Sequence, residues 1–376
     1  MFKVISFNIN SVRARLHQVQ ALIDNHSPDV IGLQETKVWD PEFPHEAIEA
    51  MGYKAHIHGQ KGHYGVALLT KKDPVNISKG FIKDMKNESD ERNLLVQWYK
   101  LIDGIWSSNC IISPQSFRRE VKMLALKQGL SLNFVGNGQN DVQEFILFMI
   151  DNMHNALSKK VSMVIEGTVC NDLDKCALEA MKSWKGFFKD DYSIFVSLFY
   201  SQLSSSIYSL DGELHSTTYQ PCCYYALPVK DEDDNIYKCF DNFTSEDRLD
   251  GDNKWLNDKT NEYIEANKKI SFWSLPKILI VVLKRFDNKG MKKMNMIKFP
   301  FELDLSKYCV GYKKNTYKYN LISVANHDGS LNSGHYYSYV KNINGNWYTY
   351  NDTMVSQMEP SKVVSQSAYC LFYKLK

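Results

Sequence analysis

The sequence lacks the features that mark membrane, secreted or strongly nucleic-acid-binding proteins. No uncharged apolar run approaches the roughly 18 residues of a transmembrane helix. Lys and Arg total 45 and Asp and Glu total 43, so the net charge of +2 gives no long-range attraction to DNA or to an anionic membrane. The N-terminal MFKVISFNIN has polar breaks and no small-residue cleavage site, so we expect no signal peptide.

The eight cysteines lack the spacing of a disulfide framework, which favours a reducing compartment and a cytoplasmic or nuclear protein. None of them lies in the first 81 residues, which instead hold six of the ten histidines. A charged stretch, KDMKNESDER (83–92), follows this change in composition. We therefore expect a first domain at 1–81, a junction at 82–93 and a second domain at 94–376.

The first domain alternates strand and helix patterns. KVISFNI, DVIGLQE and GVALLT are short apolar runs suited to strands. Between the first two, RARLHQVQALIDNH places Leu16, Val19, Leu22 and Ile23 on one helical face. This order predicts a partial α/β layered domain.

The second domain begins with helices and continues with strands. NDVQEFILFMIDNMHNAL carries an apolar stripe, and Asn140 with Gln143 resembles a capping box. The later runs YYALPV, ILIVVL, YNLISVAN, HYYSYVKN and WYTYND are typical of strands. The order predicts an α+β domain.

Three N-terminal stretches are specific when taken together: SFNIN (6–10), LQETK (33–37) and HGQKGHYGVALLT (58–70). They resemble the exonuclease III family of magnesium-dependent DNA-repair nucleases. The resemblance implies that Asn8 helps to hold the substrate phosphate and that Glu35 is a Mg²⁺ ligand. A carboxylate at a strand end can hold such a cation.

The remaining catalytic groups of that family, a second set of aspartates and an Asp-His pair, are not found. We therefore interpret Asn8 and Glu35 as relics on a partial fold, and expect Mg²⁺ only if the segment were functional. The alternative, an exonuclease III-like nuclease, rests on residues 1–81 alone. We do not expect DNA as a partner.

Seven stretches of the second domain resemble ubiquitin-specific proteases. They are QNDVQEF (139–145), CFDNFTSEDRLDGDNKW (239–255), KKISFWSLPKILIVVLKRF (268–286), FPFELDLSKY (299–308), NHDGSLNSGHYYSYVKN (326–342), WYTYNDTMVS (347–356) and AYCLFY (368–373). The resemblance implies a papain-like α+β fold with a helical part and an antiparallel-sheet part.

By this resemblance His335 is the general base of a thiol protease, and Asn351 with the adjacent Asp352 orients it. Such a base takes the proton of a cysteine, and a third polar group fixes the tautomer of the imidazole. The segment between them is long enough for two antiparallel strands joined by a turn around NINGN (342–346).

The resemblance also gives the QNDVQEF helix a binding role. Asp141 and Glu144 are three residues apart on its polar face, opposite the apolar stripe. In the family these acids meet the arginine-bearing tail of ubiquitin, as carboxylates pair with guanidinium groups. The alternative is a solvated helix start that the helix dipole favours.

The sequence departs from this family in two places. The expected pairs of Cys-x-x-Cys zinc ligands are replaced by TYQPCCYY and WLNDKTNEY, so we predict no zinc site. The box of the type Asn-x-Gly-Asn-Thr-Cys that holds the nucleophile is absent. Only Cys110, in WSSNCIISPQSF, precedes the QNDVQEF helix. We expect it to be a structural thiol, the alternative being a displaced nucleophile.

The sequence therefore predicts a chimera of a partial nuclease-like sandwich and a protease-like domain without its cysteine segment. The predicted class is deubiquitinase, with thiol-dependent hydrolysis of the bond after the C-terminal glycine of ubiquitin, and we expect this activity to be impaired. The alternative is a non-catalytic ubiquitin-binding module. We expect ubiquitin or ubiquitinated proteins as partners, a monomer, no membrane contact, and no cofactor for the protease part.

Overall fold

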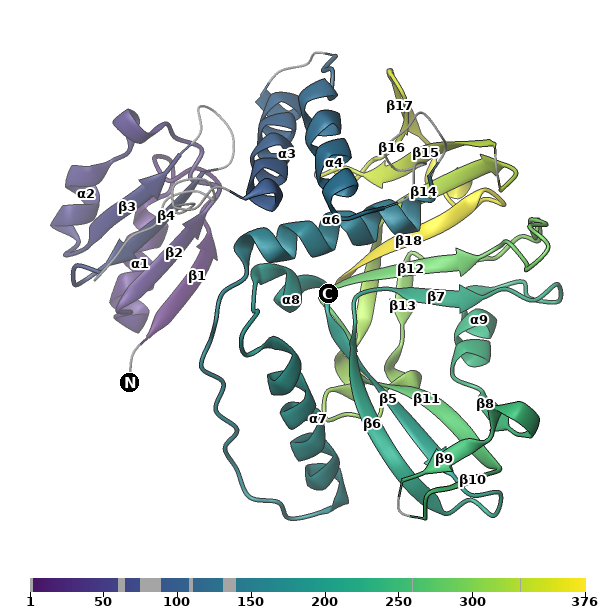
Figure 1. Ribbon diagram of the computed structural model, residues 1–376. Coiled ribbons are helices and arrows are strands. Elements are labelled where there is room, and N and C mark those ends of the chain that lie inside the picture. The colour runs from purple at the N-terminus through teal and green to yellow at the C-terminus, as the bar shows by residue number, and fades with distance from the viewer. Residues whose placement is uncertain are drawn as a thin grey trace. The chain divides into compact units, whose positions relative to one another are not determined.

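The computed structural model describes residues 3–59, 65–74, 89–107, 111–130, 140–258, 260–331 and 333–376 (Figure 1). It divides into two compact units, Met1–Glu88 and Ser89–Lys376. Most of the junction expected at 82–93, and Cys110, lie outside the described residues. The first described helix of the second unit already begins at Asp90.

The first unit is a four-stranded sheet with the order β1-β2-β4-β3 and helices beside it. Strands β1 and β2 are parallel, and the other pairs are antiparallel. The elements are β1 (Val4–Asn8), α1 (Leu16–His26), β2 (Val30–Gln34), α2 (His45–Ala50), β3 (Lys54–His58) and β4 (Val66–Thr70). The expected helix and three strands are present, whereas the apolar pattern does not predict α2 and β3.

One face of this sheet carries the core of the unit. Val19 of α1 is fully buried, and Leu33 and Leu69 are buried beneath it on neighbouring strands. Alternate residues of β4 point the other way: Val66 and Leu68 keep 51% and 39% of their surface exposed. The unit therefore buries one face of its sheet and leaves apolar side chains on the other.

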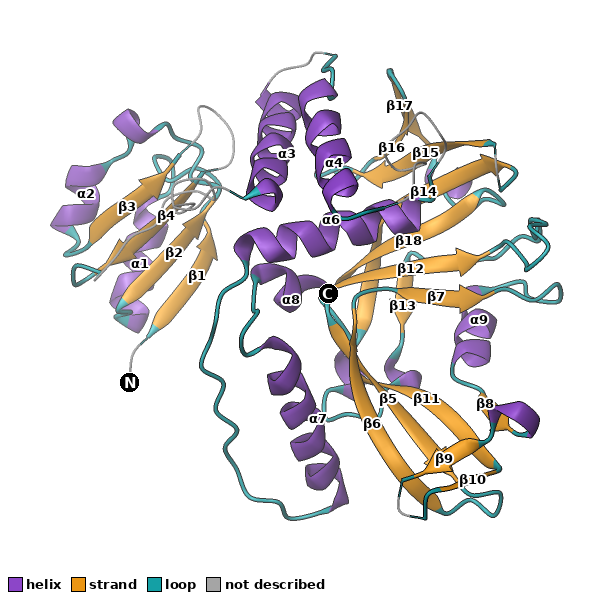
Figure 2. Ribbon diagram, in the orientation of Figure 1, coloured by secondary structure: helices purple, strands orange, loops and turns teal. Residues whose placement is uncertain are grey.

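The second unit opens with helices, shown in purple in Figure 2. These are α3 (Asp90–Ser107), α4 (Gln115–Lys127), α6 (Val142–Leu157), α7 (Asp172–Phe188), α8 (Ile194–Phe199) and, later, α9 (Ile236–Phe243). Helix α6 begins differently from the expected box of Asn140 and Gln143. Its N-cap is Asp141, whose extended backbone lets its carboxylate accept the Gln143 N–H at 2.6 Å.

Two sheets form most of the remainder. One has the order β6-β5-β11-β8; the other has eight strands, with β17-β16-β15-β14-β18-β12-β7 in order and β13 beside β14. The strands are β5 (Ser201–Tyr208), β6 (Leu214–Cys222), β7 (Tyr225–Pro228), β8 (Glu246–Leu249), β9 (Trp255–Asn257), β10 (Glu262–Ile264), β11 (Ala266–Ser274), β12 (Ile278–Lys284), β13 (Glu302–Asp304), β14 (Lys318–Gly329), β15 (Gly334–Lys341), β16 (Trp347–Asn351), β17 (Met354–Met358) and β18 (Ala368–Leu375).

Short 3₁₀ turns lie between these elements. They are η1 (Asp40–Glu42), η2 (Gly251–Asn253), η3 (Ser306–Tyr308), η4 (Lys314–Thr316) and η5 (Pro360–Lys362).

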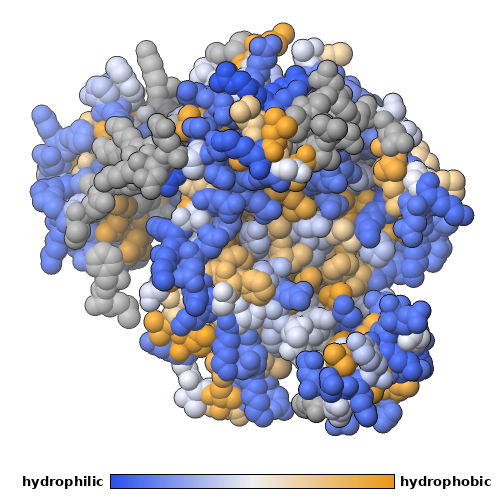
Figure 3. Space-filling view, in the orientation of Figure 1, coloured by the Kyte–Doolittle hydropathy of each residue, from blue (hydrophilic) through white to orange (hydrophobic). Residues whose placement is uncertain are grey.

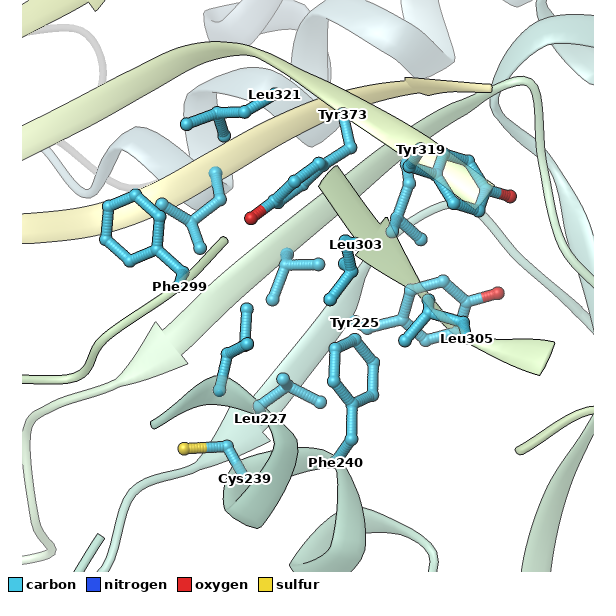
Figure 4. Close-up of a cluster of buried hydrophobic side chains, with 14 of the residues drawn as sticks. Tyr225, Leu227, Cys239, Phe240, Phe299, Leu303, Leu305, Tyr319, Leu321 and Tyr373 are labelled. Carbon is cyan, nitrogen blue, oxygen red and sulfur yellow. The ribbon is translucent and has the colours of Figure 1, made fainter. Parts of the chain in front are cut away.

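Strand β12 explains why ILIVVL is apolar without interruption. Leu279, Val281 and Leu283 point into the main core, where Tyr225, Phe240 and Tyr373 pack (Figure 4). Ile280 and Val282 point to the opposite face and pack with Ile150 of α6. Both faces of the strand are therefore buried, and no polar alternation is left. Within the described part of the chain, no helix has the length and apolar character needed to cross a membrane.

Because the two units have separate cores, we predict two unfolding transitions in scanning calorimetry. Residues 1–88 should unfold first, since one face of their sheet is uncovered. Leu33→Ala should cost about 2–5 kcal/mol and lower only the first transition, while Leu283→Ala should lower only the second. Either substitution shifting both transitions equally would contradict this.

Candidate functional site

His335 and Asn351 meet at the open end of a hairpin formed by β15 and β16. The strand register pairs Ser338 with Tyr350, so its continuation sets Asn351 opposite Tyr337, and His335, two residues before Tyr337, shares that face. His335 Nε2 lies 2.6 Å from Asn351 Oδ1. An amide oxygen only accepts, so Nε2 is the donor of this hydrogen bond, and in the neutral ring Nδ1 is then the unprotonated nitrogen. The exposed imidazole is therefore oriented as a base through Nδ1.

The structure places Asp352 apart from this pair. It lies in the two-residue turn between β16 and β17 with φ of 51°, a conformation that Asp tolerates. It is exposed, and no hydrogen bond or ion pair to another described residue is recorded for it. Of the two residues expected to orient His335, only Asn351 contacts the ring.

Glycine at position 334 brings β14 and β15 close together directly before His335. A Cβ atom there would lie 2.1 Å from Nε2 of His327 and 2.6 Å from the Asp328 carbonyl oxygen. Only glycine allows this approach. The hairpin end that carries His335 is thus held by close backbone packing.

A buried aromatic cluster, which the sequence analysis missed, supports this hairpin from below. His327 packs against Tyr336 at 4.6 Å and against Tyr369 at 5.8 Å between ring centroids. Burial, together with the nearby Lys292, lowers the pKa of His327, so this ring is neutral at neutral pH. The motif NHDG carries His327, but sequence gives no sign that the ring points inward.

The carboxylate of Asp141 joins helix α6 to the large sheet. Oδ1 accepts the Gln143 N–H, and Oδ2 accepts the hydroxyl of Tyr369 on β18. Burial, and next the hydrogen bond to Asp141, raises the pKa of Tyr369, which therefore remains a donor. Asp141 is thus a helix cap and an anchor in one group.

Glu144 lies one turn further along α6 and differs from Asp141. Its side chain is exposed and makes no hydrogen bond or ion pair with another described residue. The two acids therefore differ in role: Asp141 anchors the helix, whereas Glu144 is an exposed charge. The position of Asp141 directly before the helix is a signal that could have shown this.

The seven described cysteines form no recorded contact with His335. Burial raises the pKa values of five of them: Cys222, Cys223, Cys239, Cys309 and Cys370. For Cys223, Cys239 and Cys309 the pKa rises to about 12. A thiol with a raised pKa is mostly protonated at neutral pH and is a poor nucleophile. The other two, Cys170 and Cys176, lie before and within α7.

The segments compared with zinc-binding pairs adopt ordinary strand structure. Cys222 ends β6 and its Sγ donates to the Tyr224 carbonyl, while WLNDKTNEY forms the β9–β10 hairpin around residue 259, which is not described. Within the described ranges, no group of three or more His, Cys, Asp and Glu side chains could hold a metal.

Asn8 and Glu35 lie together at the ends of the parallel strands β1 and β2. Asn8 Nδ2 donates to Glu35 Oε1 at 2.9 Å, and Lys37 Nζ lies 3.4 Å from Oε2. The hydrogen bond from Asn8 and then Lys37 lower the pKa of Glu35. Asn8 Oδ1 accepts the Asn10 N–H. One carboxylate already paired with an ammonium does not fit a catalytic Mg²⁺ ion.

Comparison with known proteins accounts for both parts of the chain. The Ubiquitin carboxyl-terminal hydrolase family model matches residues 72–373, and the Endonuclease/Exonuclease/phosphatase family model matches residues 5–138. The chain therefore belongs to the ubiquitin carboxyl-terminal hydrolase family. The two matches overlap over residues 72–138.

Relatives of both kinds are found. Human ubiquitin carboxyl-terminal hydrolase 2 is 31% identical over 306 residues, which cover 78% of this chain and 49% of the relative. The chicken protein of that name is 32% identical over 294 residues, which cover 75% of this chain and 80% of the relative. Exodeoxyribonuclease III of Haemophilus influenzae is 55% identical over 94 residues, which cover 25% of this chain and 34% of the relative. The chain thus spans about half of the human relative.

Solved structures show the same fold. Ubp8 in a SAGA DUB module bound to monoubiquitin matches with a TM-score of 0.57 and 25% identity, covering 77% of this chain and 60% of that one. Both sequence resemblances and the expected α+β fold class are confirmed.

We predict that Asp141→Ala lowers the free energy of unfolding of the second unit by about 2–4 kcal/mol. It removes the helix cap and leaves the buried Tyr369 hydroxyl unpaired. Glu144→Ala, the control on the same helix, should change stability by less than about 0.5 kcal/mol. Urea unfolding followed by circular dichroism measures both, and equal effects would disprove the anchoring role.

Proposed function

We propose that this chain is a ubiquitin-binding member of the deubiquitinase class in which hydrolysis is absent or greatly reduced. The observation that carries the proposal is the His335–Asn351 pair in a chain without the expected cysteine box. The base is oriented, but the sequence before α6 offers Cys110 alone as a thiol, and Cys110 lies outside the described residues.

The class-specific chemistry explains why a base alone is insufficient. Nδ1 of His335 would take the proton from a thiol, and the thiolate would attack the carbonyl carbon of the C-terminal glycine of ubiquitin. The bond after that glycine would break, and His335 would pass the proton to the leaving amine. Asn351 would hold the imidazole in the correct tautomer during both proton transfers. Without the thiol, no covalent intermediate forms and only positioning groups remain.

Ubiquitin as the partner is supported by family membership and by the relative Ubp8, which was solved bound to monoubiquitin. The exposed carboxylate of Glu144 offers the more accessible charge for the two arginines of the ubiquitin tail. Asp141 contributes mainly by holding the start of α6 against Tyr369. We further propose a monomer, and a location in the cytoplasm or nucleus, where the seven described cysteines, all free of disulfides, would stay reduced.

The chain should show no turnover of a ubiquitin C-terminal fluorogenic substrate, and no covalent labelling by a cysteine-trapping ubiquitin probe. The missing nucleophile is the reason. The human relative serves as the active control. Turnover by the purified chain would disprove the proposed loss of hydrolysis, and Cys110→Ala would then show whether Cys110 is its source.

Ubiquitin binding should be weak, in the micromolar range or looser, and Asp141→Ala with Glu144→Ala should weaken it about tenfold or more, which needs only about 1.4 kcal/mol. Titration of labelled ubiquitin at low and high salt measures this. The difference should shrink at high salt, because ions screen partly exposed pairs.

Single variants separate charge from anchoring in this titration. Glu144→Gln should weaken binding without changing stability, and Asp141→Asn should keep the cap while removing the charge. Equal affinities of the native chain and the double variant would mean that this helix is only scaffold.

A further inference from the structure

An extended segment without a strand partner joins α6 to α7 and forms the long loop at the left of the second unit in Figure 1. We call residues 161–170 the strap. Its start is fixed, because Val161 N donates to the Lys189 carbonyl at 2.8 Å. Burial then alternates: Met163 and Ile165 are half-buried, whereas Ser162 and Val164 are exposed. This alternation is that of a β-strand.

Between its two ends the main chain of the strap is unpaired. From Ser162 to Val169 the described residues make no recorded main-chain to main-chain hydrogen bond. The one recorded main-chain contact in this stretch is a weak one, from Cys170 Sγ to the Thr168 carbonyl at 3.7 Å. Backbone donors and acceptors in an extended, partnerless segment can pair with another extended chain.

A groove of about 470 Å³ lies between the strap and α7. Its lining is mainly apolar and includes Met163, Val164, Ile165, Met181, Trp184 and Trp273. Figure 3 shows orange, hydrophobic atoms at the lower left, where the strap runs in Figure 1. Val164 keeps 72% of its surface exposed, and Met181 keeps 46%. The volume suits a few side chains of a ligand.

Two polar side chains in the groove wall have binding capacity left. Gln202 is only 3% exposed, and its Nε2 donates to the Ala180 carbonyl, so Oε1 remains as an acceptor. Lys185 is half-buried and has no carboxylate within ion-pair distance among the described residues. By contrast Lys182, on the same helix, is paired with Glu179 at 2.7 Å.

We propose that the strap and α7 form a docking site for an extended peptide whose groove-facing residues are apolar apart from one acid. The peptide adds as a strand to the strap, its apolar side chains enter the groove beside the two indoles, and the acidic side chain on the same face pairs with Lys185 in the groove wall. An acidic partner follows from the unpaired ammonium, and an extended one from the unpaired backbone.

This site is separate from the proposed ubiquitin-tail acids. Asp141 lies at the N-terminal end of α6, and the strap leaves its C-terminal end. The 16 residues of α6 place these ends about 24 Å apart. The docking site therefore does not depend on the proposed function.

The test uses the full chain and a fluorescein-labelled nine-residue peptide in which Leu, Phe, Val and one Glu occupy alternate positions and Ser and Thr the positions between them. Fluorescence anisotropy should show saturable binding in the micromolar range. Lys185→Gln should weaken it at least fivefold, while Lys182→Gln, which removes the same charge from the same helix, should leave it unchanged. Circular dichroism melting of both variants confirms that they are folded.

Two further peptides make the test decisive. A peptide with Lys in place of the one Glu should not bind, and one methylated on alternate amides should lose most of its affinity because it cannot pair with the strap. No saturable binding of the acidic peptide, equal binding of the lysine peptide, equal binding of the methylated peptide, or equal effects of the two lysine variants would each overturn the proposal.

Discussion

The second unit depends on the attachment of one helix to one sheet, and the carboxylate of Asp141 is the polar part of that attachment. Ile150 of helix α6 packs on Ile280 and Val282. This apolar contact stabilises the helix on the sheet, but it is non-directional and does not fix the orientation of the helix. Asp141 adds direction, because it accepts from its own helix and from Tyr369 at once. The helix start is thereby fixed against β18.

This attachment reaches the candidate active site through the sheet. Strand β18 pairs with β14, and β14 pairs with β15, the strand that begins at Gly334 and presents His335. Tyr369 and Tyr336 lie on these strands and enclose His327 between them. A shift at the start of α6 would therefore be transmitted by packed rings and ladder hydrogen bonds, not by a flexible loop.

Sequence was sufficient where a repeated pattern or a specific motif determined the outcome. The uninterrupted ILIVVL predicted a buried strand, and the segment from His335 to Asn351 predicted the hairpin that joins them. The sequence did not predict strands β5 and β6. Their residues, SQLSSSIY and LHSTTYQPC, are rich in hydroxyl side chains and show only weak apolar alternation.

The candidate site was predictable only in part for a similar reason. Its residue types are visible in the sequence, but the partner of each group is a tertiary property. From the sequence alone, Asp141 is expected to be a free acid. In the structure it accepts a hydrogen bond from Tyr369, which lies far away along the chain. From the sequence alone, Asp352 is expected to be a partner of His335. In the structure it lies in the turn after Asn351, away from the ring.

An oriented imidazole is therefore weak evidence of catalysis in this chain. His335 and Asn351 lie on neighbouring strands of one sheet, where the register places them diagonally on one face within hydrogen-bond distance. Close packing at Gly334 fixes the same end of the hairpin without any thiol. A base built in this way persists when its nucleophile is lost, because none of the interactions that hold it involves the nucleophile. Hydrolysis would also require a thiol, and the sheet that holds His335 and Asn351 does not supply one to this pair.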